Sequence, residues 1–100
     1  MKMVYICSPC RGDYENNIAA AKRYCRRAII DGVVPIAPHV YFTQFLDDDI
    51  GDERKLGMKA AIELLELCHE VWVYGDPTEG MTAEIKYAQY LCKPIILRKT

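Results

Sequence analysis

Several common sequence features are missing from this chain of 100 residues, and each absence narrows the possible functions. No apolar run approaches the ~20 residues of a membrane-spanning helix, so no membrane partner is predicted. Lysine and arginine form no stripe and the formal net charge is -1, which argues against a nucleic-acid partner. Neither the dinucleotide-binding G-x-G-x-x-G nor the P-loop G-x-x-x-x-G-K-[ST] is present. The chain shows no signal-peptide pattern, so we expect a cytoplasmic protein.

The cysteine count is 5, and an odd number argues against a closed disulfide framework. The segment Cys7-Ser8-Pro9-Cys10 has the C-x-x-C spacing of thioredoxin-like redox sites. Because Cys7 continues an apolar run, a buried thiol at a strand end is the simpler interpretation. The other cysteines, expected at core positions of helices or strand edges, are Cys25, Cys68 and Cys92. Together with His39 and His69 they show no zinc-ligand spacing.

The chain does contain a regular alternation of short apolar runs and helical patterns. The apolar runs predict strands at residues 3–7, 33–37, 71–74 and 95–97. Helices are predicted from an Asp13 cap to about residue 30, after an Asp52 cap, and through residues 81–92. Pro35 suggests that the second strand lies at a sheet edge, and residues 38–52 are interpreted as a long connection. The residues expected on the buried helix faces are Ile18, Ala21, Cys25, Ala28 and Ile29, then Met58, Ala61, Ile62 and Leu65, then Met81, Ile85, Ala88 and Cys92.

Strands without polar alternation, separated by helices, are typical of a parallel sheet covered on both faces. Right-handed crossovers then favour the strand order 2-1-3-4. We therefore predict an α/β fold: one flavodoxin-like or Rossmann-like domain of three layers over residues 1–100.

Two loops should meet between strands one and three, where the strand order reverses and open α/β sheets bind ligands. One spans residues 8–13, and its Ser8, Arg11 and Gly12 precede a helix N-terminus, which suits an anion such as a phosphate. An ordinary capped turn would explain the same residues. The other loop spans residues 75–80, where Gly80 would let a ligand approach the backbone.

Three further polar residues are expected near this edge. His39 follows strand two and would either contact a ligand or only hold its loop. Asp48 belongs to the acidic run 47–49, which could hold a sugar hydroxyl or a metal, or simply be solvated. Tyr5 lies on strand one, where its hydroxyl would either reach a carboxylate across the crevice or only be satisfied within the core.

Glu84 is the most informative residue, because it follows a buried strand in the opening turns of a helix. The positive end of that helix is expected to keep its carboxylate ionised, as suits a nucleophile or an acceptor of ligand hydroxyls. A surface carboxylate that merely favours the helix dipole is the alternative.

Together these residues resemble the nucleoside 2-deoxyribosyltransferase-like family over nearly the whole chain. The resemblance lies in V-Y-I-C-S-P with Arg11-Gly12, in Pro38-His39-Val40, and most strongly in G-M-T-A-E-I-K-Y-A from Gly80. It implies that Glu84 is the nucleophile at the anomeric carbon and that Tyr5 orients it. By comparison with members that hydrolyse deoxyribonucleoside 5'-monophosphates, it implies a 5' end or phosphate facing the first loop. The residues expected to bind the substrate are Ser8, Arg11, Gly12, His39, Asp48, Asp76, Gly80 and Met81.

One position departs from the family pattern. The family usually carries an Asp on the helix before strand three, and the matching position here is near Ile62, beside Glu63. Asp76 or an acid of 47–49 could replace it. The expected activity is cleavage or transfer at the N-glycosidic bond of a nucleoside or nucleotide, without a cofactor or a metal. The alternative is a binding module that recognises a nucleotide-derived ligand without catalysis. A homodimer or higher homo-oligomer is also expected.

Overall fold

The computed structural model describes residues 1–99 and has the predicted α/β architecture. Its elements, in chain order, are β1 (Met3–Cys7), α1 (Tyr14–Ile30), β2 (Val34–Ile36), α2 (Pro38–Phe42), α3 (Gly51–Leu67), β3 (Glu70–Tyr74), α4 (Glu79–Tyr90) and β4 (Ile95–Arg98). The sheet is parallel with the order β2-β1-β3-β4, which confirms the predicted topology and the edge position of the strand that contains Pro35.

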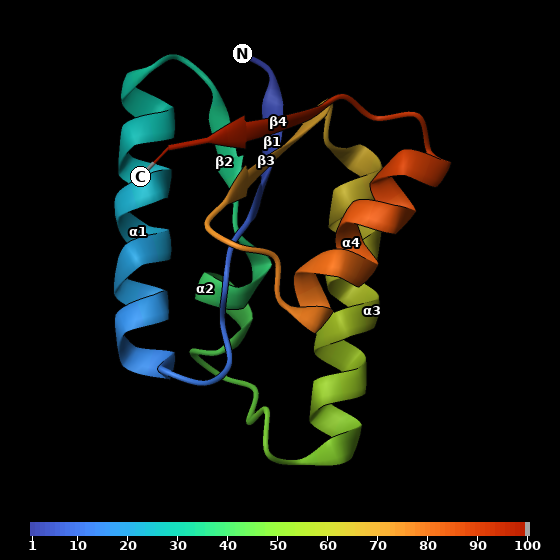
Figure 1. The fold of residues 1–100 in the computed structure, drawn as a ribbon. Helices are drawn as coiled ribbons and strands as arrows, with labels where there is room; N and C mark the ends of the chain where they lie inside the picture. The colour runs from blue at the N-terminus through green and yellow to red at the C-terminus, as the bar shows by residue number, and fades with distance from the viewer. Residues whose placement is uncertain (100) are drawn as a thin grey trace.

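The helices form layers on the two faces of the sheet (Figure 1). Helix α1 lies on one face, α3 and α4 lie on the other, and the short α2 lies beyond the carboxyl ends of the strands. Among the described residues, no helix combines the length and apolar character that a membrane crossing requires.

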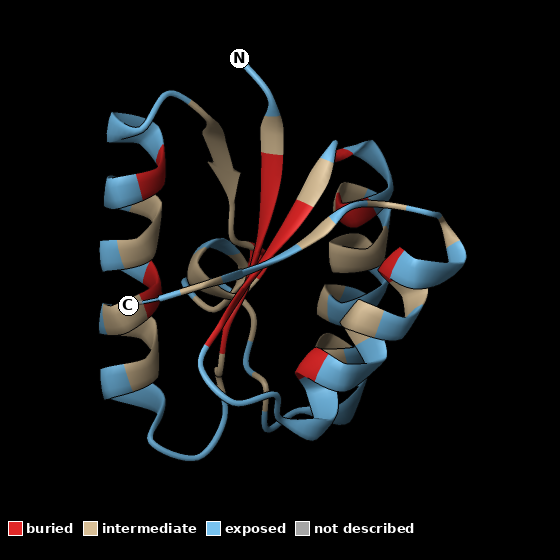
Figure 2. Cartoon of the chain, turned by 45° about the horizontal axis from the view of Figure 1, so that its top comes forward, coloured by how far each residue is buried: buried red, intermediate tan, exposed pale blue. Residues whose placement is uncertain are grey.

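The core is made by the two central strands, which are almost completely buried, whereas β4 is largely open to solvent (Figure 2). Alternate residues of β1 point to opposite faces, as the strand repeat requires. Tyr5 and Cys7 pack with Leu65 and Met81 on the α3–α4 face. Val4 and Ile6 pack on the α1 face. Because the site residues Tyr5 and Cys7 belong to the core, the sheet itself fixes their positions.

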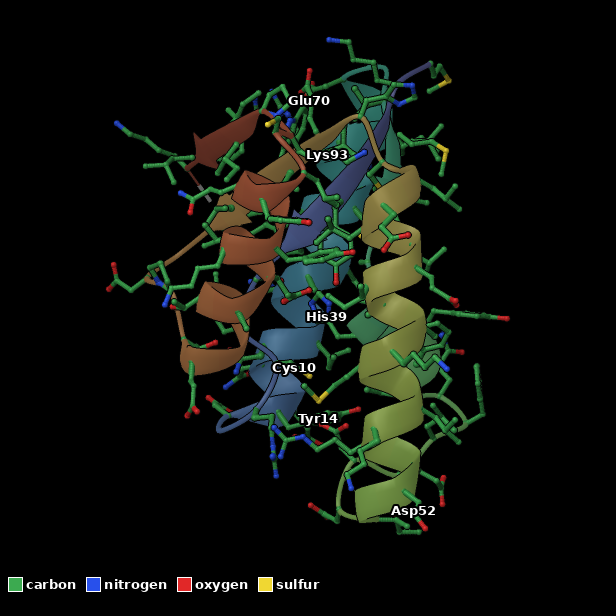
Figure 3. All side chains as sticks on the ribbon, turned by 90° about the vertical axis from the view of Figure 1, so that its right-hand side faces the viewer. Cys10, Tyr14, His39, Asp52, Glu70 and Lys93 are labelled. Carbon is green, nitrogen blue, oxygen red and sulfur yellow. The ribbon has the colours of Figure 1, made fainter. Side chains whose placement is uncertain are left out.

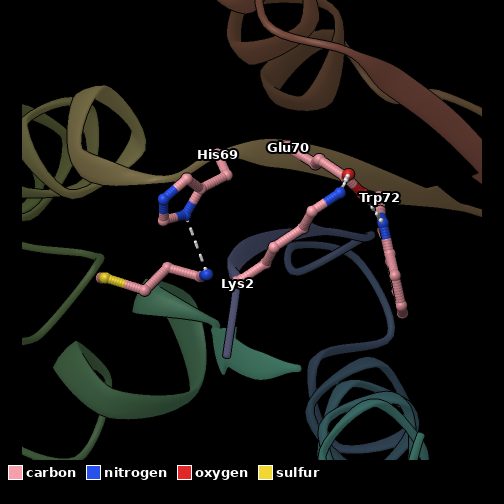
Figure 4. A network of polar contacts seen from close by, with 5 residues as sticks. Lys2, His69, Glu70 and Trp72 are labelled. Carbon is pink, nitrogen blue, oxygen red and sulfur yellow. Dashed lines mark hydrogen bonds and ion pairs between the residues drawn. The ribbon is translucent and has the colours of Figure 1, made fainter. Parts of the chain in front are cut away.

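Polar contacts close the amino ends of the central strands, opposite the predicted site (Figure 4). The Lys2 ammonium donates to the Glu70 carboxylate at 2.8 Å, and the Trp72 indole N–H donates to the same side chain at 3.0 Å. The backbone N–H of Met3 donates to Nδ1 of His69 at 3.0 Å. These contacts hold β1 and β3 in register at the end of the sheet that binds no ligand in this type of fold.

Several details of the sequence prediction were wrong. Residues 38–52 contain a helix, α2, which begins at Pro38, a favoured first helical residue. Asp52 does not cap α3, because the helix already begins at Gly51 after Ile50. Asp13 does precede α1, but its carboxylate accepts from the Asn16 side chain instead of capping the backbone.

Three residues predicted to be buried are exposed, namely Ile29, Met58 and Cys92. Cys92 lies beyond the end of α4 with a left-handed backbone (φ 58°), so the helical spacing that predicted its burial no longer applies there. Cys68 is buried as expected, and Cys25 is half-buried.

Candidate functional site

The two loops predicted to meet at the switch point do lie together, at the carboxyl ends of β1 and β3. Gly75 turns the chain after β3 with φ +74°, and the position of a Cβ there would be 3.9 Å from the Pro9 ring. Helix α4 then starts at Glu79, with Thr78 at its N-cap accepting the Met81 N–H at 3.3 Å. This cap fixes the direction of α4 and brings its second turn over β1.

Glu84 lies in that second turn, and its carboxylate is held by β1. The Tyr5 hydroxyl donates a hydrogen bond to Oε2 of Glu84. The Cys7 sulfur, two residues further along the same face of β1, lies 4.0 Å from Oε1 and 3.9 Å from the Met81 carbonyl oxygen. The carboxylate is therefore oriented by groups that the sheet holds rigid.

The electrostatics of Glu84 differ from the sequence expectation. Burial raises the pKa of Glu84, and the Tyr5 hydrogen bond opposes that rise. Glu84 is the sixth residue of α4, and the favourable field of a helix N-terminus falls off within the first turn. Burial, with the neighbouring Glu84 charge as the second cause, raises the pKa of Tyr5, so this hydroxyl keeps its proton and remains a donor.

Ser8 and His39 form a second polar pair across the site. Ser8 Oγ and His39 Nε2 lie 3.0 Å apart, and Ser8 is buried. Burial lowers the pKa of His39 to about 4, so its imidazole is neutral at physiological pH. A hydroxyl that is hydrogen-bonded to a neutral imidazole can still make a further hydrogen bond, to a ligand atom.

A cavity of about 210 Å³ joins these groups. In the view of Figure 3, His39, Cys10 and Tyr14 are seen in the gap between the ribbons of α3 and α4. The lining residues are Tyr5, Ser8, Cys10, Arg11, Pro38, His39, Phe42, Thr43, Asp48, Arg54, Gly57, Met58, Ala61, Ile62, Gly80, Ala83 and Glu84. A shallower hollow of about 590 Å³ adjoins it and shares Arg11, Thr43 and Asp48.

Seven of the ten predicted site residues line the inner cavity: Tyr5, Ser8, Arg11, His39, Asp48, Gly80 and Glu84. Gly12 lines only the outer hollow. Met81 lies buried in the core, with its carbonyl near Cys7. Asp76 is exposed and lines neither space.

Helix α3 contributes a wall of the cavity that the sequence interpretation missed. Arg54, Met58, Ala61 and Ile62 line it, together with Gly57. Their spacing of three and four residues places them on one helix face. That periodicity was visible in the sequence, but it was assigned to the hydrophobic core alone.

Nothing in this arrangement indicates a metal centre. Within residues 1–99, no group of three or more His, Cys, Asp or Glu side chains is placed to hold a metal ion. The chemistry available at the site is that of an oriented, largely buried carboxylate beside neutral hydrogen-bonding groups, a second carboxylate (Asp48) and the guanidinium groups of Arg11 and Arg54.

The fold defined by this sheet and these helices is of the nucleoside 2-deoxyribosyltransferase type. A 2-deoxyribosyltransferase from Bacillus psychrosaccharolyticus superposes with a TM-score of 0.71 at 18% identity, over 97% of this chain and 72% of that one. A 2-desoxiribosyltransferase from Leishmania mexicana superposes with a TM-score of 0.70 at 21% identity. This alignment covers 100% of the present chain but only 65% of the Leishmania protein.

By sequence, the chain belongs to the family described as "Domain of unknown function (DUF7768)", whose model matches residues 2–98. No curated protein sequence matches it.

Proposed function

We propose that this protein cleaves or transfers the N-glycosidic bond of a (deoxy)nucleoside or nucleoside 5'-monophosphate, with Glu84 as the nucleophile. The observation that carries the proposal is the Glu84 carboxylate, which lines a cavity of about 210 Å³ while Tyr5 holds one of its oxygens. The likeness of the fold to 2-deoxyribosyltransferases supports the same reaction class.

In the first step, a Glu84 oxygen attacks the anomeric carbon through an oxocarbenium-like transition state. The electron pair of the N-glycosidic bond leaves with the base, and a glycosyl ester of Glu84 forms. In the second step, water or a second base attacks the same carbon and frees the carboxylate. The acceptor thus decides between hydrolysis and transfer.

The residues after β1 are suited to the 5' end of the ligand. Ser8 and His39 present a hydroxyl and a neutral imidazole, and Arg11 adds a positive charge at the cavity wall. A guanidinium with nearby hydrogen-bond donors recognises a phosphate or a hydroxyl well. We therefore assign the 5' hydroxyl or 5' phosphate to this end of the cavity.

The alternative function is binding without catalysis, and one observation favours it. Ile62 forms part of the cavity wall at the place where the resemblance leads one to expect an acid. A departing base would then find no carboxylic acid at this position of α3 to protonate it, and the proton would have to come from Asp48 or from water.

Incubation with a panel of deoxynucleosides and their monophosphates, with and without an acceptor base, tests the proposal. Release of free base that disappears in Glu84→Ala is the expected result. Base release that persists in this variant would rule out the nucleophile, and binding without release would support the binding module. The expected homodimer or higher homo-oligomer stays a prediction, which light scattering on the same sample tests.

A further inference from the structure

The acidic run after α2 contains side chains with different surroundings. Asp47 accepts the backbone N–H of Asp49 at 2.9 Å, and Glu53 accepts the backbone N–H of Asp47 at 3.0 Å. These two carboxylates hold the loop against the start of α3. The Asp48 carboxylate takes no part in this network, and within residues 1–99 it has no hydrogen bond or ion pair.

Arg54, on α3, is a second charged residue that has no partner among the described residues. It is half-buried, lines the inner cavity, and has no side-chain hydrogen bond or ion pair with any residue that the structure describes. Arg54 and Asp48 both line the inner cavity, and they form no ion pair with each other. A partly buried charge without a partner is unfavourable, so a ligand that pairs with both side chains would relieve this cost.

Asp48 lines the inner cavity together with Cys10, and its charge acts on the Cys10 sulfur. Burial raises the pKa of Cys10 to about 11, and the negative charges of Asp48 and Glu84 contribute to the rise. Cys10 itself lines the cavity. Asp48 and Glu84 therefore both act on one point inside it.

The size of the cavity limits what can reach this pair. Its volume of about 210 Å³ lies below the ~300 Å³ at which typical ligand pockets begin. The lining of the cavity also includes large apolar side chains, namely Phe42, Met58 and Ile62. A flat aromatic ring fits such a lining, with its polar edge directed toward the charged pair. With the 5' end assigned to Ser8 and Arg11, the ring that points toward α3 is the base.

We propose that Asp48 and Arg54 select a base of the guanine type, a 2-amino-6-oxopurine. This inference rests on the proposed function. A carboxylate only accepts hydrogen bonds and a guanidinium only donates them. Guanine is the nucleobase that offers two adjacent N–H donors, on N1 and the 2-amino group, to a bidentate acceptor. Beside them lie O6 and N7, the acceptors that arginine binds in its commonest base contact.

Equilibrium binding of the 5'-monophosphates of deoxyguanosine, deoxyadenosine, deoxycytidine and thymidine tests this assignment. It is measured by calorimetry in a Glu84→Gln background, where turnover does not consume the ligand. We expect the guanine nucleotide to bind more tightly by roughly 5- to 150-fold, the ratio that one good bidentate contact supplies. Asp48→Asn should abolish that preference, whereas Asp49→Asn, which alters a neighbouring acid outside the inner cavity, should retain it.

A second pair of variants tests the inference even if Asp48→Asn impairs folding. Arg54→Met should weaken binding of the guanine nucleotide most, and Lys55→Met, at the adjacent exposed position, should not. Equal binding of all the nucleotides, or a guanine preference that survives both Asp48→Asn and Arg54→Met, would overturn the inference. Turnover of nucleotides by the unmodified protein without a guanine preference overturns the inference alone. A guanine preference without turnover overturns only the catalytic proposal, and no binding at all overturns both.

Discussion

Replacing Glu84 by glutamine should make the protein more stable at neutral pH while it removes the proposed activity. Glu84 is a largely buried carboxylate whose pKa is raised by burial. At neutral pH the native state must therefore hold a poorly solvated negative charge. The glutamine side chain would keep nearly the same shape and still accept the Tyr5 hydrogen bond, but it carries no charge.

The effect of pH on stability follows from the difference between the pKa of Glu84 in the folded and in the unfolded state. The pKa of Glu84 is higher in the folded than in the unfolded state, so its favourable contribution is complete below the unfolded value of about 4.3. That contribution is lost as the pH rises through the folded pKa. The wild-type protein thus bears the cost of the charge at pH 7 but not in acid, and the neutral glutamine variant bears it at neither pH.

Substitutions that relieve the strain of a functional site commonly stabilise a protein by about 0.5–2 kcal/mol. In a domain of this size, 1 kcal/mol shifts Tm by about 4–8 °C. Thermal unfolding followed by circular dichroism at pH 7 and near pH 4 measures the effect. Glu79→Gln, at an exposed carboxylate in the first turn of α4, is the control and should show no such gain. A Glu84→Gln variant that is less stable at pH 7, or whose gain is the same in acid, would refute the reasoning.

Three further predictions concern the contacts around the site and the ends of the helices. Tyr5→Phe removes the hydrogen bond that lowers the pKa of Glu84, so the acid limb of the activity profile should move to higher pH and turnover should fall roughly 10- to 100-fold; an unchanged profile would contradict this role. Lys93→Met removes the ammonium that donates to the carbonyl oxygens of Glu66 (2.8 Å) and Cys68 (2.6 Å) at the end of α3. It should lower the unfolding free energy by about 1–3 kcal/mol in urea titrations. Lys86→Met, on the exposed face of α4, is the control and should not lower it. Thr78→Ala removes the N-cap of α4 and should cost about 1 kcal/mol in the same assay, with Thr78→Ser restoring most of it; equal losses in both variants would exclude capping as the cause.

Most of the fold could be predicted because its signals are local and repeated. Apolar runs located the central strands, and β1 was predicted with the bounds that the structure has. The handedness of crossovers then fixed the strand order. The errors lie where tertiary context decides: Cys92 follows the helical spacing but falls past the end of α4, and α2 is a helix of only 5 residues, too short for a periodic pattern.

The candidate site was predictable where residues follow a strand, and less so elsewhere. Tyr5, Ser8 and Glu84 come together because parallel strands end at one edge of the sheet. Arg54 was missed because nothing in the local sequence says that the start of α3 borders a cavity. The raised pKa of Glu84 was also missed, because the helix position was visible in the sequence and the burial was not.

Trapping the proposed covalent intermediate on Glu84 is the most direct test of the proposed function. A 2-fluoro-2-deoxyribonucleoside, or its 5'-monophosphate, slows the second step more than the first and lets a glycosyl ester accumulate. Mass spectrometry of the intact and digested protein should then show one added sugar, located on the α4 peptide at Glu84. Release of the base at a measurable rate with no adduct at Glu84, or with an adduct at another residue, would contradict the proposed mechanism.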